Sequence, residues 1–141
     1  MQLKIKILKK CVKIPKYAYD GDAGMDLFSL EDVKLNPGDR HTFWLGFACE
    51  FDKNFAALIW DKGGVATKKG LHTIAGVIDS GYRGEWNVNL LNINSESVEV
   101  KKGEKIAQAI FSPIVQPEIK IVKELEQTQR GKGCFGSSGK Y

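Results

Sequence analysis

One stretch of the chain places a carboxylate and an aromatic ring three residues apart, Asp79 and Tyr82, among turn-forming residues. Apolar residues precede them and a strand-like run follows, so the pattern predicts a β-hairpin across Ile74–Asn92. A hairpin tip would hold both side chains on a rigid base, where Asp79 could activate water or lie beside a metal-bound polyphosphate. The alternative is a turn aspartate that bonds its own backbone, beside a tyrosine that only covers apolar surface.

Two further segments contain residues that suit phosphate. Lys62, Gly63 and Gly64 combine a cation with glycines whose N–H groups an anion can approach closely. Gln108, in the segment 103–108, can donate from its amide. Each also has a structural interpretation, as a simple turn and as a surface strand residue.

The tail after residue 124 loses periodicity and becomes rich in glycine. Its guanidinium suits a terminal phosphate, its hydroxyls suit bridging oxygens, and its ring could lie over a base. The alternative is a disordered linker. The tail residues with these groups are Arg130, Phe135, Gly136, Ser137 and Ser138.

Composition indicates one globular domain of 141 residues, with 43% hydrophobic and 27% charged residues. The net charge of +4 comes from scattered lysines, which suits an anionic ligand and does not indicate a nucleic acid. We find no signal peptide and no apolar run near the roughly 18 residues of a membrane span. Three cysteines without a close pair favour a reducing, cytoplasmic compartment and argue against a zinc site.

Short strands separated by turns must position these groups. No amphipathic helix of ten or more residues is evident, so the pattern predicts an all-β sandwich or barrel. Strict alternation makes 40–51 the clearest long strand, with one apolar face formed by Phe43, Leu45, Phe47, Cys49 and Phe51. The other expected elements are strands at 3–8, 55–60, 97–100 and 105–114, renewed alternation at 118–122, and one helical turn at 66–69.

In order and spacing these segments resemble the trimeric dUTPases (deoxyuridine 5′-triphosphate nucleotidohydrolases). Five motifs carry the resemblance across nearly the whole chain: 23–27 (AGMDL), 61–66 (DKGGVA), 76–85 (GVIDSGYRGE), 103–108 (GEKIAQ) and 130–139. The resemblance implies a jelly-roll-like sandwich, here residues 1–124, which forms a homotrimer with sites at the subunit interfaces. It also implies that residues 125–141 form a flexible lid over bound nucleotide.

The resemblance implies hydrolysis of dUTP to dUMP and pyrophosphate, which keeps uracil out of DNA and supplies dUMP for thymidylate synthesis. Asp79 matches the general base that activates water for attack on the α-phosphorus. Mg²⁺ would ride on the triphosphate and water, with no direct protein ligand. Asp26 matches a motif carboxylate that shapes the site.

The remaining positions match substrate contacts. Tyr82 matches the ring that packs on deoxyribose and excludes a 2′-hydroxyl, and the backbone at Gly76, Val77 and Ile78 matches the strand that bonds uracil. The residues that match phosphate or base contacts are Lys62, Gly63, Gly64 and Gln108, and in the tail Arg130 (γ-phosphate), Phe135 (over uracil), Gly136, Ser137 and Ser138.

Some positions depart from the family pattern. Lys62 and Gly63 replace the usual Arg-Ser pair, which loses the two-pronged geometry of arginine and a hydroxyl near the scissile bridge. Gly81 stands where many members have a second aspartate. In the tail, Cys134 replaces a glycine and Ser138 a threonine, which affects lid closure.

Two other functions remain as alternatives. The related dCTP deaminases share the turn motif but use a glutamate in the next strand, where this chain has Asn89, an amide that cannot shuttle protons. A binding or regulatory relative could keep the fold without the chemistry, and Gly63 is the one feature that favours it.

Overall fold

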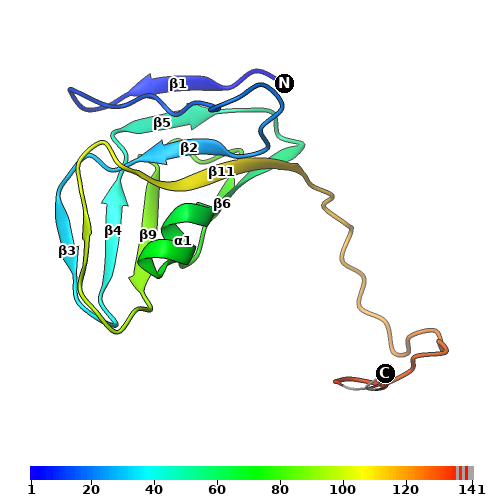
Figure 1. Ribbon diagram of the computed structural model, residues 1–141. Coiled ribbons are helices and arrows are strands. Elements are labelled where there is room, and N and C mark those ends of the chain that lie inside the picture. The colour runs from blue at the N-terminus through cyan, green and yellow to red at the C-terminus, as the bar shows by residue number, and fades with distance from the viewer. Residues whose placement is uncertain (136, 138, 140–141) are drawn as a thin grey trace.

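The computed structural model describes residues 1–135, 137 and 139. Within them the chain forms eleven strands and one short helix (Figure 1). The elements are β1 (Lys4–Ile7), β2 (Met25–Phe28), β3 (Val33–Leu35), β4 (Arg40–Trp44), β5 (Phe47–Glu50), β6 (Phe55–Asp61), α1 (Gly63–Lys69), β7 (Leu71–Thr73), β8 (Val77–Asp79), β9 (Asn87–Asn92), β10 (Val98–Val100) and β11 (Lys105–Pro113). No helix in this part of the chain is long and apolar enough to cross a membrane.

The strands pair antiparallel in two main sheets. One has the order β2-β11-β6-β8 and the other β4-β9-β7, while β1 pairs with β5 and β3 with β10. In Figure 1, β4 and β9 run across the direction of β2 and β11, with α1 beside them. The predicted all-β, jelly-roll-like sandwich is confirmed.

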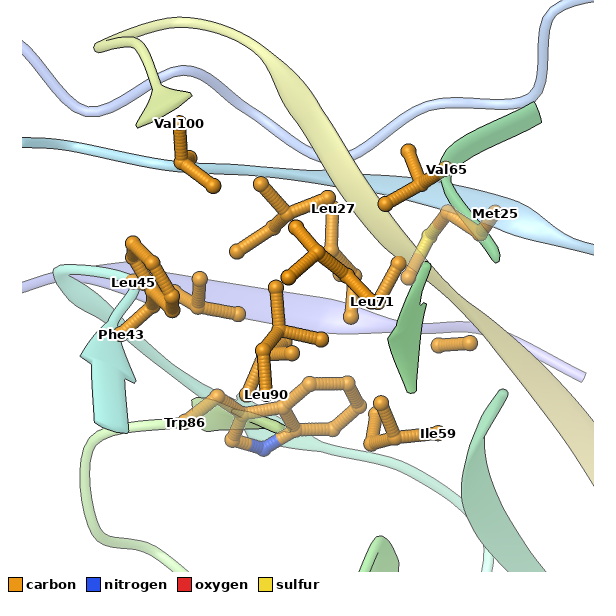
Figure 2. Close-up of a cluster of buried hydrophobic side chains, with 14 of the residues drawn as sticks. Met25, Leu27, Phe43, Leu45, Ile59, Val65, Leu71, Trp86, Leu90 and Val100 are labelled. Carbon is orange, nitrogen blue, oxygen red and sulfur yellow. The ribbon is translucent and has the colours of Figure 1, made fainter. Parts of the chain in front are cut away.

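Alternating apolar residues from both sheets form one core. The inward set predicted between residues 40 and 51 is confirmed, because its members are all nearly inaccessible to solvent: Phe43, Leu45, Phe47, Cys49 and Phe51. Figure 2 shows Leu71 and Leu90 from one sheet among Met25, Leu27 and Ile59 from the other. Burial of this apolar surface is the main stabilising contribution to the fold.

The prediction of one continuous strand over 40–51 is wrong. Gly46 has φ of +75° and separates β4 from β5, so the chain leaves the pairing with β9 and joins β1. Large apolar residues still occupy every second position through the break, although the chain from Leu45 to Cys49 is buried throughout. A periodicity of two therefore cannot reveal that the strand changes its partner.

Two smaller predictions also need correction. The helix begins at Gly63, before the single turn expected at 66–69, because glycine is tolerated at a helix start that bears no cap. Residues 118–122 form no strand within the described chain, and Ile119 and Ile121 are almost fully exposed. The last strand ends at Pro113, and Figure 1 shows the arm beyond it extending away from the sandwich.

We expect Gly46→Ala to destabilise the fold by about 2–3 kcal/mol, since an added Cβ would lie 2.5 Å from Val12 Cγ2 and 2.8 Å from Leu30 Cδ1 at a positive φ. Gly38→Ala is the matched control, because Gly38 has φ of +79° but no atom within 4 Å of the added Cβ. Equilibrium urea unfolding measures both variants. Equal losses would contradict the proposed crowding.

Candidate functional site

The predicted hairpin across 74–92 is wrong, because β8 and β9 belong to different sheets. β7 pairs with β9, and Ile74 N still donates to Asn89 O at 3.0 Å. Ala75 and Gly76 then take φ values of +63° and +131°, which turn the chain out of this ladder. β8 pairs with β6 in the other sheet instead.

Gly76 makes this change of sheet sterically feasible. Ile59 N donates to Gly76 O at 2.7 Å, so the two backbones are in close contact. A Cβ at position 76 would lie 2.8 Å from Ile59 O, which leaves no room for a side chain. Both the close approach and the positive φ therefore require glycine.

The change of sheet opens a pocket of about 230 Å³ between β8 and β9. Its walls are formed by the segment Thr73–Asp79 and by Ile59, Tyr82, Trp86, Asn87 and Asn89. β8 is an edge strand of its sheet, so main-chain groups on its free side face no neighbouring strand of the described chain. The free main-chain donors and acceptors of such an edge can bind a planar ligand by hydrogen bonds.

Asp79 and Tyr82 lie at the rim of this pocket. Tyr82 N donates to Asp79 O at 3.0 Å, which closes a tight turn, and Tyr82 Oη donates to Glu85 O at 3.1 Å. Asp79 is exposed, and its carboxylate forms no hydrogen bond or ion pair with any described residue. The carboxylate is therefore available to accept a proton from a ligand or from water.

A second group of predicted residues surrounds Asp26, which is only 1% exposed. Lys62 Nζ lies 2.6 Å from Asp26 Oδ1, and Lys105 Nζ lies 2.6 Å from Asp26 Oδ2. Burial raises the pKa of Asp26, but the contacts with Lys105 and Lys62 outweigh it, so the pKa lies below its usual value. The cluster holds two cations around one carboxylate and so favours an anionic ligand.

Gly63, Gly64 and Gln108 adjoin this cluster. The first main-chain bonds of α1 come from Val65 and Ala66, and an added Cβ at either glycine would meet nothing within 4 Å. Gln108 Nε2 donates to the main-chain oxygen of Asp61 at 2.9 Å, which leaves its second proton for a ligand. We call Asp26, Lys62, Gly63, Gly64 and Gln108 the cradle.

The pocket rim and the cradle lie at opposite ends of β6. Asp79 pairs with Ala56 near the start of this strand, while Lys62 follows Asp61 at its end. Lys62 lies six residues after Ala56, which is roughly 20 Å of extended chain at about 3.4 Å per residue. One chain therefore does not bring Asp79 within reach of a phosphate held in its own cradle.

The tail residues lie apart from both groups. Arg130 Nε donates to Gly133 O at 3.0 Å within the tail itself, and Phe135 is fully exposed. Ser137 belongs to the same exposed segment, while Gly136 and Ser138 lie outside the described residues. Figure 1 shows the tail reaching away from the sandwich.

Reasoning from sequence missed two charged residues. Lys105 pairs with Asp26 across the β2–β11 ladder, and Asp61 binds Thr73 of β7. An aspartate inside the apolar segment Met25–Phe28 was a usable signal, because a buried carboxylate requires a cationic partner. The partner of Asp61 depends on strand pairing that a single sequence does not reveal.

Comparison with known proteins identifies the family. The model of the dUTPase family matches residues 10–139. The deoxyuridine 5′-triphosphate nucleotidohydrolase of Clostridium tetani is 48% identical over 140 residues, which cover 98% of this chain and 97% of the relative. The chain belongs to the dUTPase family. The enzyme of the same name from Nautilia profundicola is 46% identical over 99% of this chain and 100% of its own.

Solved dUTPases have the same fold. The dUTPase of Staphylococcus bacteriophage 80alpha with dUPNHPP superposes with a TM-score of 0.91 at 31% identity, covering 98% of each chain. A mutant dUTPase of phage phi11 of S. aureus, in which a structural Mg(II) ion is coordinated, has a TM-score of 0.83 at 25% identity, over 90% of this chain and 100% of its own. Membership of the dUTPase family and the all-β architecture therefore rest on sequence and structure alike.

The lowered pKa of Asp26 predicts a specific acid sensitivity. The folded state favours the ionised carboxylate, so its stabilisation is present above the unfolded pKa, near 4, and is lost as the pH falls through the folded pKa. We expect Asp26→Asn to be about 3 kcal/mol less stable at pH 7, because two lysines lose their counter-charge. Between pH 5 and 2.5 (roughly the titration range of a carboxyl group), the variant should lose less stability than the wild type in urea titrations. Parallel pH profiles would contradict the assignment.

Proposed function

We propose that this protein hydrolyses dUTP to dUMP and pyrophosphate, keeping uracil out of DNA and supplying dUMP for thymidylate synthesis. One observation carries the proposal: a carboxylate without a protein partner among the described residues stands at the rim of a pocket bordered by a free strand edge. Membership of the dUTPase family supports the substrate and the reaction.

Asp79 is the proposed general base. Its carboxylate accepts a proton from a water molecule, whose oxygen then attacks the α-phosphorus in line with the bond to the bridging oxygen. That bond breaks and its electron pair leaves with pyrophosphate. The turn closed by Tyr82 N and Asp79 O supports this role, since it fixes the backbone from which the carboxylate projects.

The pocket is the proposed site for uracil and deoxyribose. Main-chain groups of Gly76, Val77 and Ile78 would bond the edge of the base, and the ring of Tyr82 would pack on the sugar. Contacts by the backbone at a sheet edge are directional, so they favour one arrangement of donors and acceptors on the base. The tail would contribute Phe135 over the base, with the remaining contacts from Arg130, Gly136, Ser137 and Ser138.

The cradle is the proposed phosphate site. Lys62, the amides of Gly63 and Gly64, and Gln108 supply cationic and neutral donors, which suit phosphate oxygens and not a metal ion. The described residues contain no group of three or more His, Cys, Asp or Glu side chains that could hold a metal. This donor set fits a Mg²⁺ ion carried by the triphosphate and water, and the bound ion would neutralise and orient the phosphates.

The wide separation of rim and cradle supports a site shared between chains. An α-phosphorus beside Asp79 of one chain would need the cradle of a second chain, and the tail could come from a third. Apolar side chains left exposed on the single chain, such as Trp60, Val77 and Ile121, support assembly. We therefore propose a homotrimer in a cytoplasmic, reducing compartment.

The structure disfavours the deaminase alternative. Asn89 stands at the position of the required glutamate, where its Oδ1 accepts from Thr42 Oγ1 at 2.5 Å and its Nδ2 donates to Asn87 Oδ1 at 3.0 Å. A side-chain amide is neither an acid nor a base at neutral pH, so Asn89 cannot shuttle a proton as the glutamate would. Measurement of dUTP turnover distinguishes an enzyme from a relative that only binds the nucleotide.

Purified protein with Mg²⁺ should release pyrophosphate from dUTP, while dCTP and UTP should be poor substrates. We expect Asp79→Asn to lower kcat at least a hundredfold, because general-base catalysis contributes about 10²–10⁴. The affinity for dUTP, measured by calorimetry, should change less than about threefold, since the isosteric amide keeps the turn. Wild-type turnover in the variant would remove Asp79 from the mechanism, and absence of turnover in the wild type would favour the binding-only alternative.

Deletion of residues 130–141 should lower kcat/KM for dUTP at least tenfold, because Arg130, Phe135 and the hydroxyls leave with the tail. The melting temperature should stay within about 2 °C, since the tail lies outside the core cluster. Light scattering should give three times the chain mass for each protein, and the chain mass of the full-length protein is 15.7 kDa. Unchanged turnover in the truncated protein would contradict the role of the tail as a lid. An active enzyme that is a monomer would contradict a site shared between chains.

A further inference from the structure

Asp61 forms contacts with both groups of site residues. It is the last residue of β6, and its side chain is 26% exposed. Its Oδ1 accepts from Thr73 N at 2.6 Å and from Thr73 Oγ1 at 2.7 Å, while Oδ2 lies 2.7 Å from His72 Nδ1. Its main-chain oxygen accepts from Gln108 Nε2. Side chain and main chain therefore serve different partners.

Thr73 is the residue at which the pocket wall begins. It ends β7 and lines the pocket, and the positive φ values of Ala75 and Gly76 follow directly. Between β7 and β8 the wall is held by Ile74 N on Asn89 and by Gly76 O on Ile59. The two hydrogen bonds from Thr73 to Asp61, which we call the anchor, therefore fix the end of the pocket wall that adjoins β7.

The donor and the acceptor in each hydrogen bond of the anchor are fixed by chemistry. A carboxylate only accepts hydrogen bonds, so Thr73 must direct both its N–H and its O–H toward Asp61. Burial raises the pKa of Asp61, but bonds from His72 and Thr73 outweigh it and lower the pKa, so the acceptor is charged at neutral pH. Charge-assisted bonds of this kind are the stronger ones.

We propose that Asp61 is a positioning residue for the base pocket, which holds Thr73 in place and acts on the base end of the nucleotide alone. This inference rests on the proposed function. The phosphate end is spared because Gln108 binds the main-chain oxygen of Asp61, which no side-chain substitution removes.

The test compares Asp61→Ala with Asp61→Asn, which keeps an acceptor oxygen for Thr73. The probes are deoxyuridine, which has the base and sugar, and inorganic pyrophosphate, which has only phosphate, both as inhibitors of dUTP hydrolysis. Asp39→Ala is the matched control, since Asp39 Oδ2 also accepts a main-chain N–H, from Asn36 at 2.8 Å, in a turn that does not line the pocket. Melting temperatures of all variants establish that they fold.

In Asp61→Ala we expect the inhibition constant of deoxyuridine and the KM of dUTP to rise about tenfold. The inhibition constant of pyrophosphate and kcat should change less than twofold, and Asp61→Asn should lie within threefold of the wild type. Equal weakening of both inhibitors, or no weakening of deoxyuridine, would overturn the proposal. Failure of the wild type to hydrolyse dUTP would instead refute the proposed function, and deoxyuridine binding by calorimetry would still test Asp61.

Discussion

The contact between the backbones of Gly76 and Ile59 is the constraint on which the site depends. It brings the chain out of one sheet and into the other within two residues, and the gap between the sheets becomes a pocket. A side chain at position 76 would separate the two strands, because the clash would be with main-chain atoms that cannot rotate away. Pocket, free strand edge and rim therefore all follow from one residue without a Cβ.

The buried carboxylate of Asp26 organises the other half of the site in a different way. Two lysines satisfy its charge, and both remain partly exposed, at 31% and 39% of their side chains. If Lys62 turned toward a phosphate in the proposed site, Lys105 would still neutralise Asp26, so the buried carboxylate would keep a cationic partner. The cradle can thus release one cation to a ligand at small electrostatic cost.

Much of this fold could be predicted from alternation. The inward set from Phe43 to Phe51 follows from a period of two, and so does the absence of a long helix among the described residues. The break at Gly46 could not be predicted, because large apolar residues continue at every second position across the change of partner. The departure of Val77–Asp79 from the hairpin has the same cause, since pairing with β6 is a long-range choice.

The candidate site was predictable as a set of residues but not as an arrangement. Motif order indicates which residues belong together, yet only the strand pairing reveals that Asp79 and Lys62 lie at opposite ends of β6. Lys105 and Asp61 were missed because their partners, Asp26 and Thr73, are distant in sequence. Charged contacts across a ladder have no local signature.

The separation of rim and cradle along β6 has a genetic consequence for the proposed trimer. A chain with an inactivating substitution at the rim still has an intact cradle. A chain with an inactivating substitution in the cradle still has an intact rim. Mixed assemblies of two inactive alleles would then contain some intact centres, whereas alleles damaged at the same end would not rescue each other. In the proposed trimer, whether two inactive alleles complement each other would therefore depend on the end of β6 at which each substitution lies.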